Sequence, residues 1–213
     1  PALVNAVTIN EKFFFRHPKQ YEAIAETLLP EFIRDHSRQR VRIWSAACST
    51  GDEPYTLALL IHDRVKPRFP NVQFSIMGTD INTEVLQTAR DGRYGDYAVR
   101  NIPTTYLHKY FQHQGDHYTI APEITRMVQY KHLNLTDPRA MQRLSRFDII
   151  LCANVLIYFD SETKQAVISN LYDRLQRGGY LFVGTSETLH GVTRALQPVR
   201  FSDTIAYHKE ESS

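Results

Sequence analysis

One stretch in the first quarter of the chain constrains the fold most, because an apolar run passes through a row of small residues into a helical pattern. Val41, Ile43 and Trp44 predict a buried strand. Residues 46–51 supply a loop with little side-chain bulk, and Pro54 stands where the first turn of a helix accepts proline. The stretch therefore predicts a strand that turns into a helix through a loop whose backbone a ligand can approach closely.

A second apolar run, residues 72–78, ends in Thr79 and Asp80. A small-residue loop after the first strand and a carboxylate after the second are the arrangement with which parallel α/β sheets bind a nucleoside, since the carboxylate accepts hydrogen bonds from the ribose hydroxyls. Gly51 is the only glycine of the loop, which therefore fails the Gly-x-Gly-x-x-Gly pattern. This departure argues against an ordinary NAD site and leaves other nucleosides open.

Strand and helix patterns alternate along most of the chain. Helices are predicted over 18–37, with a kink near Pro30, and over 53–65, 82–90, 138–144 and 161–177, where Gly178 and Gly179 form the predicted C-cap. Strands are predicted over 41–45, 72–78, 127–133, 147–153 and 180–183, followed by an antiparallel hairpin over 199–208. The alternation predicts an α/β fold with a doubly wound, mostly parallel sheet. It breaks between 93 and 126, which we interpret as a small inserted subdomain.

Length and composition exclude several classes of protein. The 213 residues suffice for one α/β domain but hardly for two cores, and 42% hydrophobic with 23% charged residues is ordinary for a globular protein. A net charge of +2 gives no sign of a nucleic-acid binder, and no apolar run is long enough to span a membrane. Cys48 and Cys152 lie in apolar surroundings, which predicts reduced thiols in a cytoplasmic protein. His108, His113 and His117 lack metal-ligand spacing, so no metal is expected.

Five separated blocks of sequence contribute to one resemblance. The blocks are residues 10–16, 44–55, 78–82, 147–160 and 178–187. Together they resemble the chemotaxis receptor methyltransferases of the CheR family, which transfer a methyl group from S-adenosylmethionine to receptor glutamates. The resemblance covers nearly the whole chain from Asn10 onward and implies a class I methyltransferase fold. It also implies an S-adenosylmethionine-binding methyltransferase domain over residues 1–213, which acts on the cytoplasmic helical region of chemoreceptors and yields S-adenosylhomocysteine.

Position and resemblance together give candidate cofactor-binding residues. Asp80 is expected to hold the ribose diol, and a cap for the helix that starts near Asn82 is the alternative. Glu53 stands at a helix N-terminus, and the family assigns it the ammonium group of the cofactor; a capping role alone is the alternative, and the two roles are compatible. Asn134 matches the family position that borders the adenine, with Leu135 beside it, and a turn-forming asparagine is the competing interpretation.

Further candidates come from both ends of the sequence: Asn10, Arg16 and Asn154 are expected to bind the cofactor, and Arg16 and Tyr158 to act on the substrate. Arg16 follows residues 13–15, an aromatic run expected to be buried, and the family implies that its guanidinium lies near the cofactor's carboxylate and the substrate glutamate. A structural salt bridge is the alternative for Arg16, and Asn10 is a further candidate for the cofactor's carboxylate. Asn154 and Tyr158 follow a strand that should finish over the cofactor, where Tyr158 is either an active-site wall or a core residue. We predict that Arg16 and Tyr158 orient the substrate carboxylate and that no residue acts as a covalent nucleophile.

Several features depart from the family pattern. Lys12 stands where the first block often has threonine, and Ala153 stands where the fourth often has arginine. Both are candidate cofactor contacts. Lys12 can replace the charge of the arginine missing at position 153 only if the two positions face the same pocket. The stretch 112–118 is short and has only Gly115, so tethering to a receptor's C-terminal tail is not expected. The N-terminal helical domain that is usual in the family is expected to be absent.

Two competing hypotheses stay open on the sequence alone. The first is a methyltransferase with another substrate. Residues 154–158 lack the Asn/Asp-Pro-Pro-Tyr sequence with which amino-directed DNA enzymes hold a flipped base. Cytosine-C5 enzymes need a Pro-Cys nucleophile, and Cys152 has no preceding proline. We therefore expect no nucleic-acid substrate. The second is a module that binds the cofactor without catalysis, and the substitutions at Lys12 and Ala153 are its only support.

Overall fold

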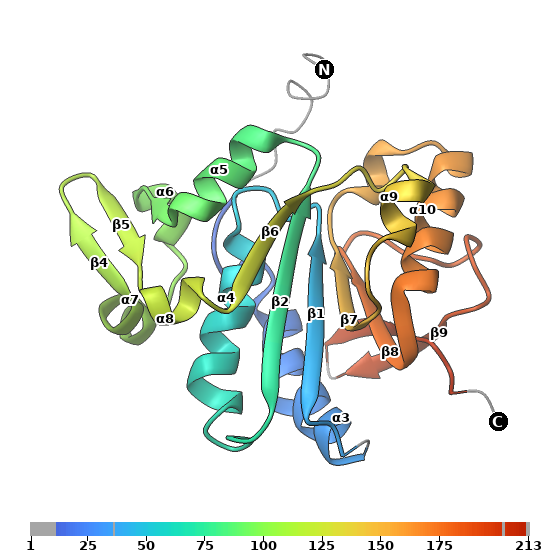
Figure 1. The fold of residues 1–213 in the computed structure, drawn as a ribbon, viewed down its shortest axis with the longest axis horizontal. Helices are drawn as coiled ribbons and strands as arrows, with labels where there is room; N and C mark the ends of the chain where they lie inside the picture. The colour runs from blue at the N-terminus through green and yellow to red at the C-terminus, as the bar shows by residue number, and fades with distance from the viewer. Residues whose placement is uncertain (1–11, 36, 202, 212–213) are drawn as a thin grey trace.

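A seven-stranded sheet forms the centre of the molecule in the computed structural model, which describes residues 12–35, 37–201 and 203–211. The strands lie in the order β6-β2-β1-β7-β8-β10-β9 (Figure 1). Their bounds are β1 Arg40–Ala46, β2 Gln73–Asp80, β6 Val128–His132, β7 Phe147–Cys152, β8 Leu175–Val183, β9 Gln197–Phe201 and β10 Thr204–His208. Neighbours from β6 to β8 run parallel, whereas β10 is antiparallel to β8 and β9. The predicted mostly parallel α/β sheet with a C-terminal hairpin is confirmed.

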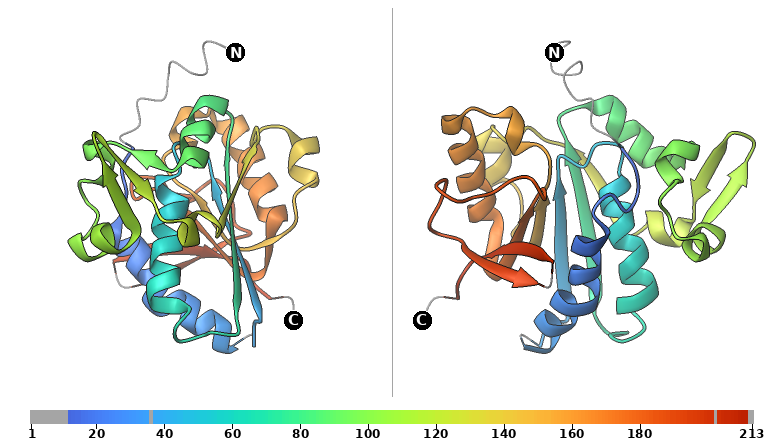
Figure 2. Two further views of the ribbon diagram at one scale, coloured as in Figure 1. Left: turned by 60° about the vertical axis from the view of Figure 1, so that its left-hand side comes forward. Right: turned by 180° about the vertical axis from the view of Figure 1, so that it is seen from behind.

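Helices cover both faces of this sheet (Figure 2). One layer consists of α2 Pro18–Glu22, a π-helical segment Ala23–Leu28, α3 Leu29–Asp35, α4 Asp52–Leu60 and a second π-helical segment Ile61–Val65. The other consists of α9 Pro138–Gln142 and α10 Ser161–Arg174, and α5 Thr83–Asp91 follows β2. Among the described residues, no helix is both long enough and apolar enough to cross a bilayer.

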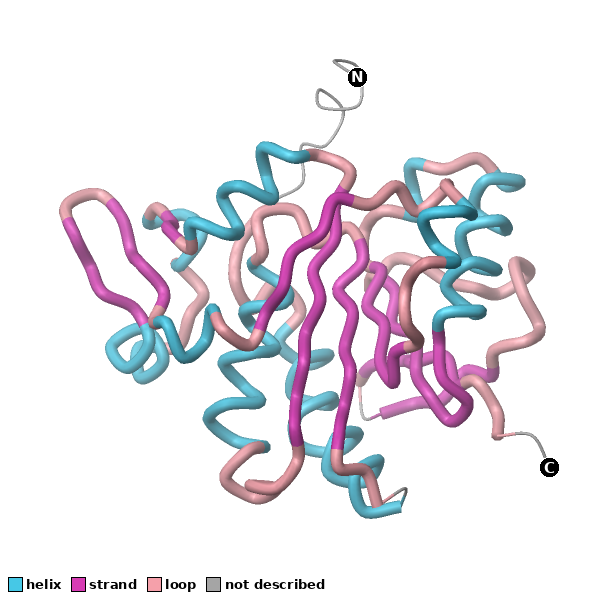
Figure 3. The backbone as a smooth tube through the Cα atoms, in the orientation of Figure 1, coloured by secondary structure: helices cyan, strands magenta, loops and turns pink. Residues whose placement is uncertain are grey.

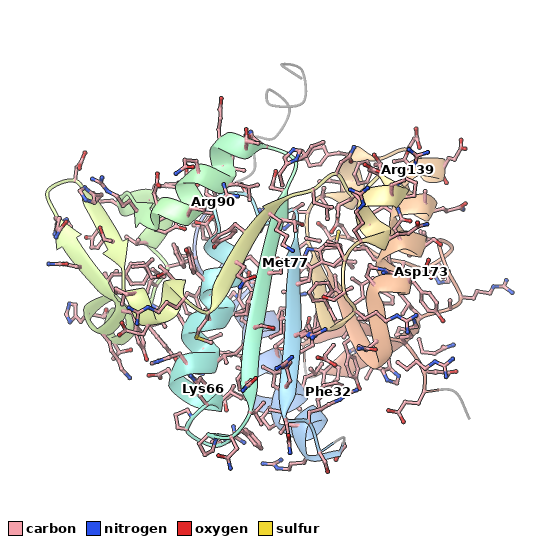
Figure 4. All side chains as sticks on the ribbon, viewed as in Figure 1. Phe32, Lys66, Met77, Arg90, Arg139 and Asp173 are labelled. Atoms are coloured by element: carbon pink, nitrogen blue, oxygen red, sulfur yellow. The ribbon has the colours of Figure 1, made fainter. Side chains whose placement is uncertain are left out.

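Alternating side chains on the central strand explain why two layers form. On β1, Val41 and Ile43 join the core that includes α3 and α4, whereas Trp44 and Ala46 join the core that includes α9 and α10. Met77 on β2 belongs to the second of these cores (Figure 4). Because both faces of the parallel strands are covered, their sequences are almost continuously apolar.

A small antiparallel sheet stands beside β6 and α4 (Figure 1). It contains three strands in the order β3-β5-β4. The segment consists of β3 Arg93–Tyr94, α6 Asp96–Val99, α7 Thr104–Tyr110, β4 Phe111–Gln114, β5 His117–Ile120 and α8 Pro122–Thr125. Tyr94 reaches out of it and donates a hydrogen bond of 2.7 Å from its hydroxyl to the Thr50 carbonyl oxygen. The Phe14 ring packs edge-on against Tyr94 and Phe111, with centroids 4.8 and 5.4 Å away.

The predicted end of the long C-terminal helix is wrong. Helix α10 ends at Arg174, Leu175 is already extended, and Gly178 and Gly179 lie inside β8. Gly178 has a φ of 75°, and a Cβ on Gly179 would lie 2.7 Å from the Asp148 carbonyl oxygen. The register between β7 and β8 shifts across this glycine pair. The pair therefore forms an irregularity within a strand, where side chains do not fit, rather than a helix cap.

The helix predicted over 18–37 changes its winding just before Pro30. The π-helical segment Ala23–Leu28 separates α2 from α3. Proline has no amide hydrogen to donate, and its ring crowds the carbonyl one turn earlier, at Glu26. A locally wider turn relieves that crowding, which explains the irregularity near the predicted kink.

Candidate active site

Loops that follow the parallel strands gather at one end of the sheet (Figure 3). They line a cavity of about 360 Å³, which we call the larger cavity. Of the predicted site residues, it is lined by Asp80, Asn134, Leu135, Ala153, Asn154 and Tyr158. The carboxyl ends of strands are where open parallel sheets bind their ligands.

A second space of about 60 Å³, the smaller cavity, adjoins the first. Of the predicted site residues, it is lined by Lys12, Arg16, Glu53, Ala153 and Asn154. The two cavities share Ala47, Ser49, Ala153 and Asn154 in their walls. The structure thus brings together all predicted site residues except Asn10, which lies outside the described residues.

Asp80 is the last residue of β2 and links two loops of the larger cavity. Its Oδ2 accepts a hydrogen bond of 2.9 Å from the Ser49 amide, and its Oδ1 accepts one of 2.9 Å from the Asn82 amide. The cap of α5 is formed by the Asn82 side chain, which accepts from the amides of Glu84 and Val85. The capping alternative for Asp80 therefore fails, and both carboxylate oxygens keep lone pairs for further donors.

The loop after β1 has an unusual backbone. Ala47 and Ser49 have φ values of 59° and 50°, in the left-handed region that non-glycine residues rarely adopt. Gly51 has a φ of 88°, and a Cβ there would lie 2.6 Å from the Tyr130 hydroxyl oxygen. The Cys48 amide donates to the Thr79 carbonyl oxygen at 2.8 Å, which fixes the loop on β2. Backbone strain of this kind concentrates at ligand sites.

Two acidic residues at the start of α4 face the smaller cavity. Glu53 accepts a hydrogen bond of 2.7 Å from the Ser45 hydroxyl, and burial raises the pKa of Glu53 to about 7 against the opposing effects of Ser45 and Arg16. Asp52 is only 6% exposed, and burial raises its pKa too. Its Oδ2 accepts from the Thr50 hydroxyl, whereas its Oδ1 has no hydrogen-bond partner among the described residues. Burying a carboxylate without a full set of partners costs free energy, and a cation that binds beside it offsets this cost.

The smaller cavity is also lined by the cations Lys12 and Arg16. Of the aromatic run predicted to be buried, Phe14 and Phe15 are buried, at 0% and 8% exposure, whereas Phe13 is only half-buried and lines the cavity. Phe15 has a φ of 55°, and its amide donates to the Thr56 hydroxyl at 3.2 Å. This anchoring on α4 directs Arg16 into the site. Lys12 and Ala153 face the same cavity, which meets the geometric condition for Lys12 to replace the missing arginine.

Asn134 forms a turn and also lines a cavity. Its Oδ1 accepts hydrogen bonds of 3.0 Å from the Thr136 amide and 2.8 Å from the Thr136 hydroxyl, which is an Asx turn. The residue also lines the larger cavity beside the buried Leu135. Because Oδ1 is engaged, the amide nitrogen is the group that Asn134 presents to a ligand.

Tyr158 lies at the mouth of the larger cavity. It ends a 3₁₀ turn, Leu156–Tyr158, and 43% of its surface is exposed. The turn is anchored by Leu156, which is 1% exposed. The core alternative for Tyr158 therefore fails, and its phenol forms part of the cavity wall.

Sequence reasoning missed Asp52, described above, and two further polar residues at or beside the site, His17 and Glu187. His17 lines the smaller cavity, and its Nε2 lies 3.3 Å from the Asn154 Nδ2. Burial and the Arg16 charge lower the pKa of His17, against the opposing charge of Glu187. The Glu187 carboxylate accepts a hydrogen bond of 2.8 Å from the Asn154 amide. The available signals were weak: His17 follows Arg16, and Glu187 ends the fifth block.

The two cavities fit S-adenosylmethionine by the chemistry of their donors and acceptors. The larger cavity offers a ribose-type carboxylate at Asp80 and apolar walls that include Ile81 and Leu133. The smaller cavity offers both carboxylates and cations, which suits an amino acid's ammonium and carboxylate groups. In the described ranges, no cluster of three or more His, Cys, Asp or Glu side chains has the arrangement of a metal site.

Comparisons with known proteins agree with this chemistry. The family model "CheR methyltransferase, SAM binding domain" matches residues 10–205. Over 209 residues the chain is 34% identical to chemotaxis protein methyltransferase 2 of Vibrio cholerae, covering 98% of this chain and 72% of the relative. It is 37% identical, also over 209 residues, to chemotaxis protein methyltransferase 1 of Pseudomonas aeruginosa, covering 96% of this chain and 76% of the relative.

A solved structure adds a likeness of fold. An O-methyltransferase family protein from Burkholderia thailandensis is 15% identical, with a TM-score of 0.50, and the match covers 100% of this chain and 68% of that one. The family match and the relatives extend over nearly the whole chain. The chain therefore belongs to the CheR methyltransferase family and contains its S-adenosylmethionine-binding domain.

Proposed function

We propose that this chain transfers the methyl group of S-adenosylmethionine to glutamate side chains of chemoreceptors and so forms glutamate methyl esters in chemotaxis-type signalling. The observation that carries the proposal is the pair of adjoining cavities, one suited to a nucleoside and one suited to an amino acid, with Tyr158 at the mouth. The relatives named as chemotaxis protein methyltransferases support the same activity.

The proposal gives each part of the cofactor a set of residues. Asp80 accepts from the ribose hydroxyls, and Asn134 and Leu135 border the adenine. Glu53 faces the ammonium group, and close to the same space lies the Asp52 Oδ1, which has no hydrogen-bond partner in the part of the chain that the structure describes. The carboxylate lies toward Arg16 and Lys12, with Asn10 as a further candidate from the sequence, and the segment of Ala153 and Asn154 separates the two halves, since both residues line both cavities.

The reaction requires alignment more than acid–base chemistry. S-adenosylmethionine supplies a methyl group on a positively charged sulfur. A glutamate carboxylate is already ionised at neutral pH, with an ordinary pKa near 4.3, so no residue has to generate the nucleophile. Arg16 and Tyr158 orient the incoming carboxylate, and alignment of this kind can lower a barrier by roughly 7–11 kcal/mol. Cys48 and Cys152 are buried and burial raises their pKa, so neither serves as a covalent nucleophile.

The partner in this proposal is the cytoplasmic helical region of chemoreceptors, with the reaction in the cytoplasm. Tethering to a receptor tail is not part of it, because Gly115 and Asp116 alone connect β4 to β5. Nucleic acid is not part of it either, because the net charge is only +2. The substrate glutamate would reach the site past the exposed Ile157 and Tyr158.

The test is methylation of a chemoreceptor cytoplasmic fragment with radiolabelled S-adenosylmethionine. Label that is released as methanol by mild base identifies glutamate methyl esters. We expect release from the fragment and none from a fragment whose candidate glutamates are changed to alanine. Asp80→Asn should abolish labelling, and Asp91→Asn, an exposed aspartate on α5, is the matched control. Cofactor binding without base-labile label on any receptor fragment would support the non-catalytic alternative instead.

A further inference from the structure

A single carboxylate outside the proposed cofactor contacts organises one wall of the active site. The Oε2 atom of Glu187 accepts hydrogen bonds of 2.8 Å from the backbone amide of Asn154 and 2.7 Å from the backbone amide of Gly184. Its Oε1 atom accepts one of 3.2 Å from the Ile157 amide. Three backbone donors thus converge on one side chain, and bonds to an ionised acceptor are stronger than those between neutral groups.

Two of these donors belong to the loop of residues 153–158, which is short and strained. Asn154 has a φ of 58°, a left-handed conformation that costs about 1 kcal/mol or more in a non-glycine residue. The loop carries Asn154, which lines both cavities, and Tyr158, which lines the larger one. Its tip is exposed at Ile157 and Tyr158, so packing alone does not hold it. Glu187 holds the amides of Asn154 and Ile157 on either side of the buried Leu156.

The turn that presents Glu187 is matched to this task. The Glu187 amide donates to the Gly184 carbonyl oxygen at 2.9 Å, so the side chain folds back over Gly184. A Cβ on Gly184 would lie 2.8 Å from the Glu187 Oε2 and 2.7 Å from the Asn154 Oδ1. Only glycine leaves room for the carboxylate to reach the Asn154 amide.

We propose that Glu187 is a positioning residue for methyl transfer, which holds Asn154 and Tyr158 in place through backbone hydrogen bonds. This inference rests on the proposed function. Glu187 lines neither of the two cavities of the site and acts through the loop 153–158. Its loss should therefore slow the reaction more than it weakens cofactor binding, because Asp80 ends β2 and Glu53 lies in α4, both outside this loop. A displacement of about 1 Å in a positioning group can cost up to about 100-fold in rate.

The main test is Glu187→Gln. Glutamine has one oxygen and one NH₂ group in place of the two carboxylate oxygens. The NH₂ group cannot accept a hydrogen bond, so whichever backbone amide it faces loses its bond to this side chain. We expect kcat on a receptor fragment to fall roughly 10- to 100-fold, with the Kd of S-adenosylhomocysteine changed by less than about threefold. The exposed Glu162→Gln in α10 is the matched control and should leave both values unchanged.

Hydrogen exchange tests the same inference without relying on activity. In Glu187→Gln the amides of Asn154 and Ile157 should exchange faster, whereas those of β1 and β2 should not change. Faster exchange with an unchanged kcat would overturn the positioning role. Unchanged exchange would overturn the loop contact itself. If the wild-type chain methylates no receptor, the proposed function fails, while exchange and cofactor binding still test whether Glu187 holds the loop.

A double-mutant cycle with Gly184→Ala separates the hydrogen-bonded unit from general loss of stability. We expect Gly184→Ala alone to lower kcat, because its Cβ collides with the carboxylate and with Asn154. The additional effect of Gly184→Ala should be several-fold smaller when Glu187 is already glutamine, because both variants disturb the same bonds. Fully additive effects would overturn the proposal.

Discussion

The two cavities of the active site obtain their selectivity by different means. In the larger cavity, Asp80 is held by two backbone amides, and the remaining walls are largely apolar side chains at strand ends. In the smaller cavity, Asp52 and Glu53 face Lys12 and Arg16, and burial shifts the pKa of both carboxyl groups upward. The first half depends on a rigid backbone, and the second depends on a balance of charges.

This difference leads to a general expectation about binding. A carboxylate held by two backbone amides should bind its ligand through the fixed geometry of its loop. A buried group that titrates near neutrality should instead make binding depend on pH, and its partners should make binding depend on salt. The variants below test whether the two halves differ in this way.

The largest effect is expected for Asp80→Asn. The substitution removes the charge and turns an NH₂ group toward one of the two backbone amides. Loss of charge-assisted hydrogen bonds should weaken S-adenosylhomocysteine binding roughly 100-fold, or about 2.7 kcal/mol. Calorimetry of the variant and of the wild-type chain at pH 7 measures this factor. A loss of less than about threefold would remove Asp80 from the binding contacts.

A smaller, pH-dependent effect is expected at Glu53. The ammonium group of the ligand pairs with the ionised carboxyl, and the pKa of Glu53 is about 7 in the unliganded chain. Affinity should therefore fall about tenfold between pH 8 and pH 6. Glu53→Gln should bind more weakly at pH 8 and show a flatter pH profile. An equally steep profile in the variant would assign the dependence to another group.

A third, smaller effect is expected at Lys12, the candidate replacement for the arginine often found in the family at the position of Ala153. Lys12→Ala should weaken S-adenosylhomocysteine binding about fivefold at low salt and less at high salt, as expected for a partly exposed ion pair. The double variant Lys12→Ala with Ala153→Arg should regain affinity, because both positions face the smaller cavity. Lys19→Ala, at an exposed lysine paired with Asp203, is the control. A double variant no better than Lys12→Ala would argue against replacement of one cation by the other.

The smallest effect concerns the stability of the unliganded chain. The pKa of Glu53 lies above its ordinary 4.5, so the folded chain holds this proton more tightly than the unfolded chain. The contribution to stability is full below about pH 4.5 and is lost as the pH rises through about 7. Glu53→Gln should therefore gain Tm relative to wild type between pH 6 and pH 8, by a few degrees. Thermal unfolding of Glu53→Gln, of the control Glu162→Gln and of wild type at both pH values measures this gain in Tm. An equal gain in both variants would contradict the assignment of the pH dependence to Glu53.

The larger cavity could be predicted well from the sequence, and the smaller one only by analogy. The apolar runs of β1 and β2 and the acidic end of β2 are local patterns, so Asp80 follows from its position. The pairing of Lys12 and Arg16 with Asp52 and Glu53 joins segments far apart in sequence, and no periodicity reveals it.

Other features were beyond sequence reasoning for a different reason. Gly178 and Gly179 satisfy the rule for a helix end, yet the tertiary contact with the Asp148 carbonyl oxygen places them in a strand. Glu187 stands in an ordinary turn after β8, and only the fold brings it to the Asn154 amide. Local rules identify glycines and acids but not which distant backbone they meet.

The hydrogen bond from Tyr94 to the Thr50 carbonyl oxygen affects any attempt to exchange modules between relatives. Tyr94 belongs to the small antiparallel sheet, and Thr50 belongs to the loop that forms the floor of the site. The Phe14 ring packs on Tyr94 from the segment that carries Lys12 and Arg16. A chimera that replaces residues 93–126 must therefore keep a tyrosine at position 94. Without it, the chimera would lose the hydrogen bond that holds the loop of residues 46–51 at the site.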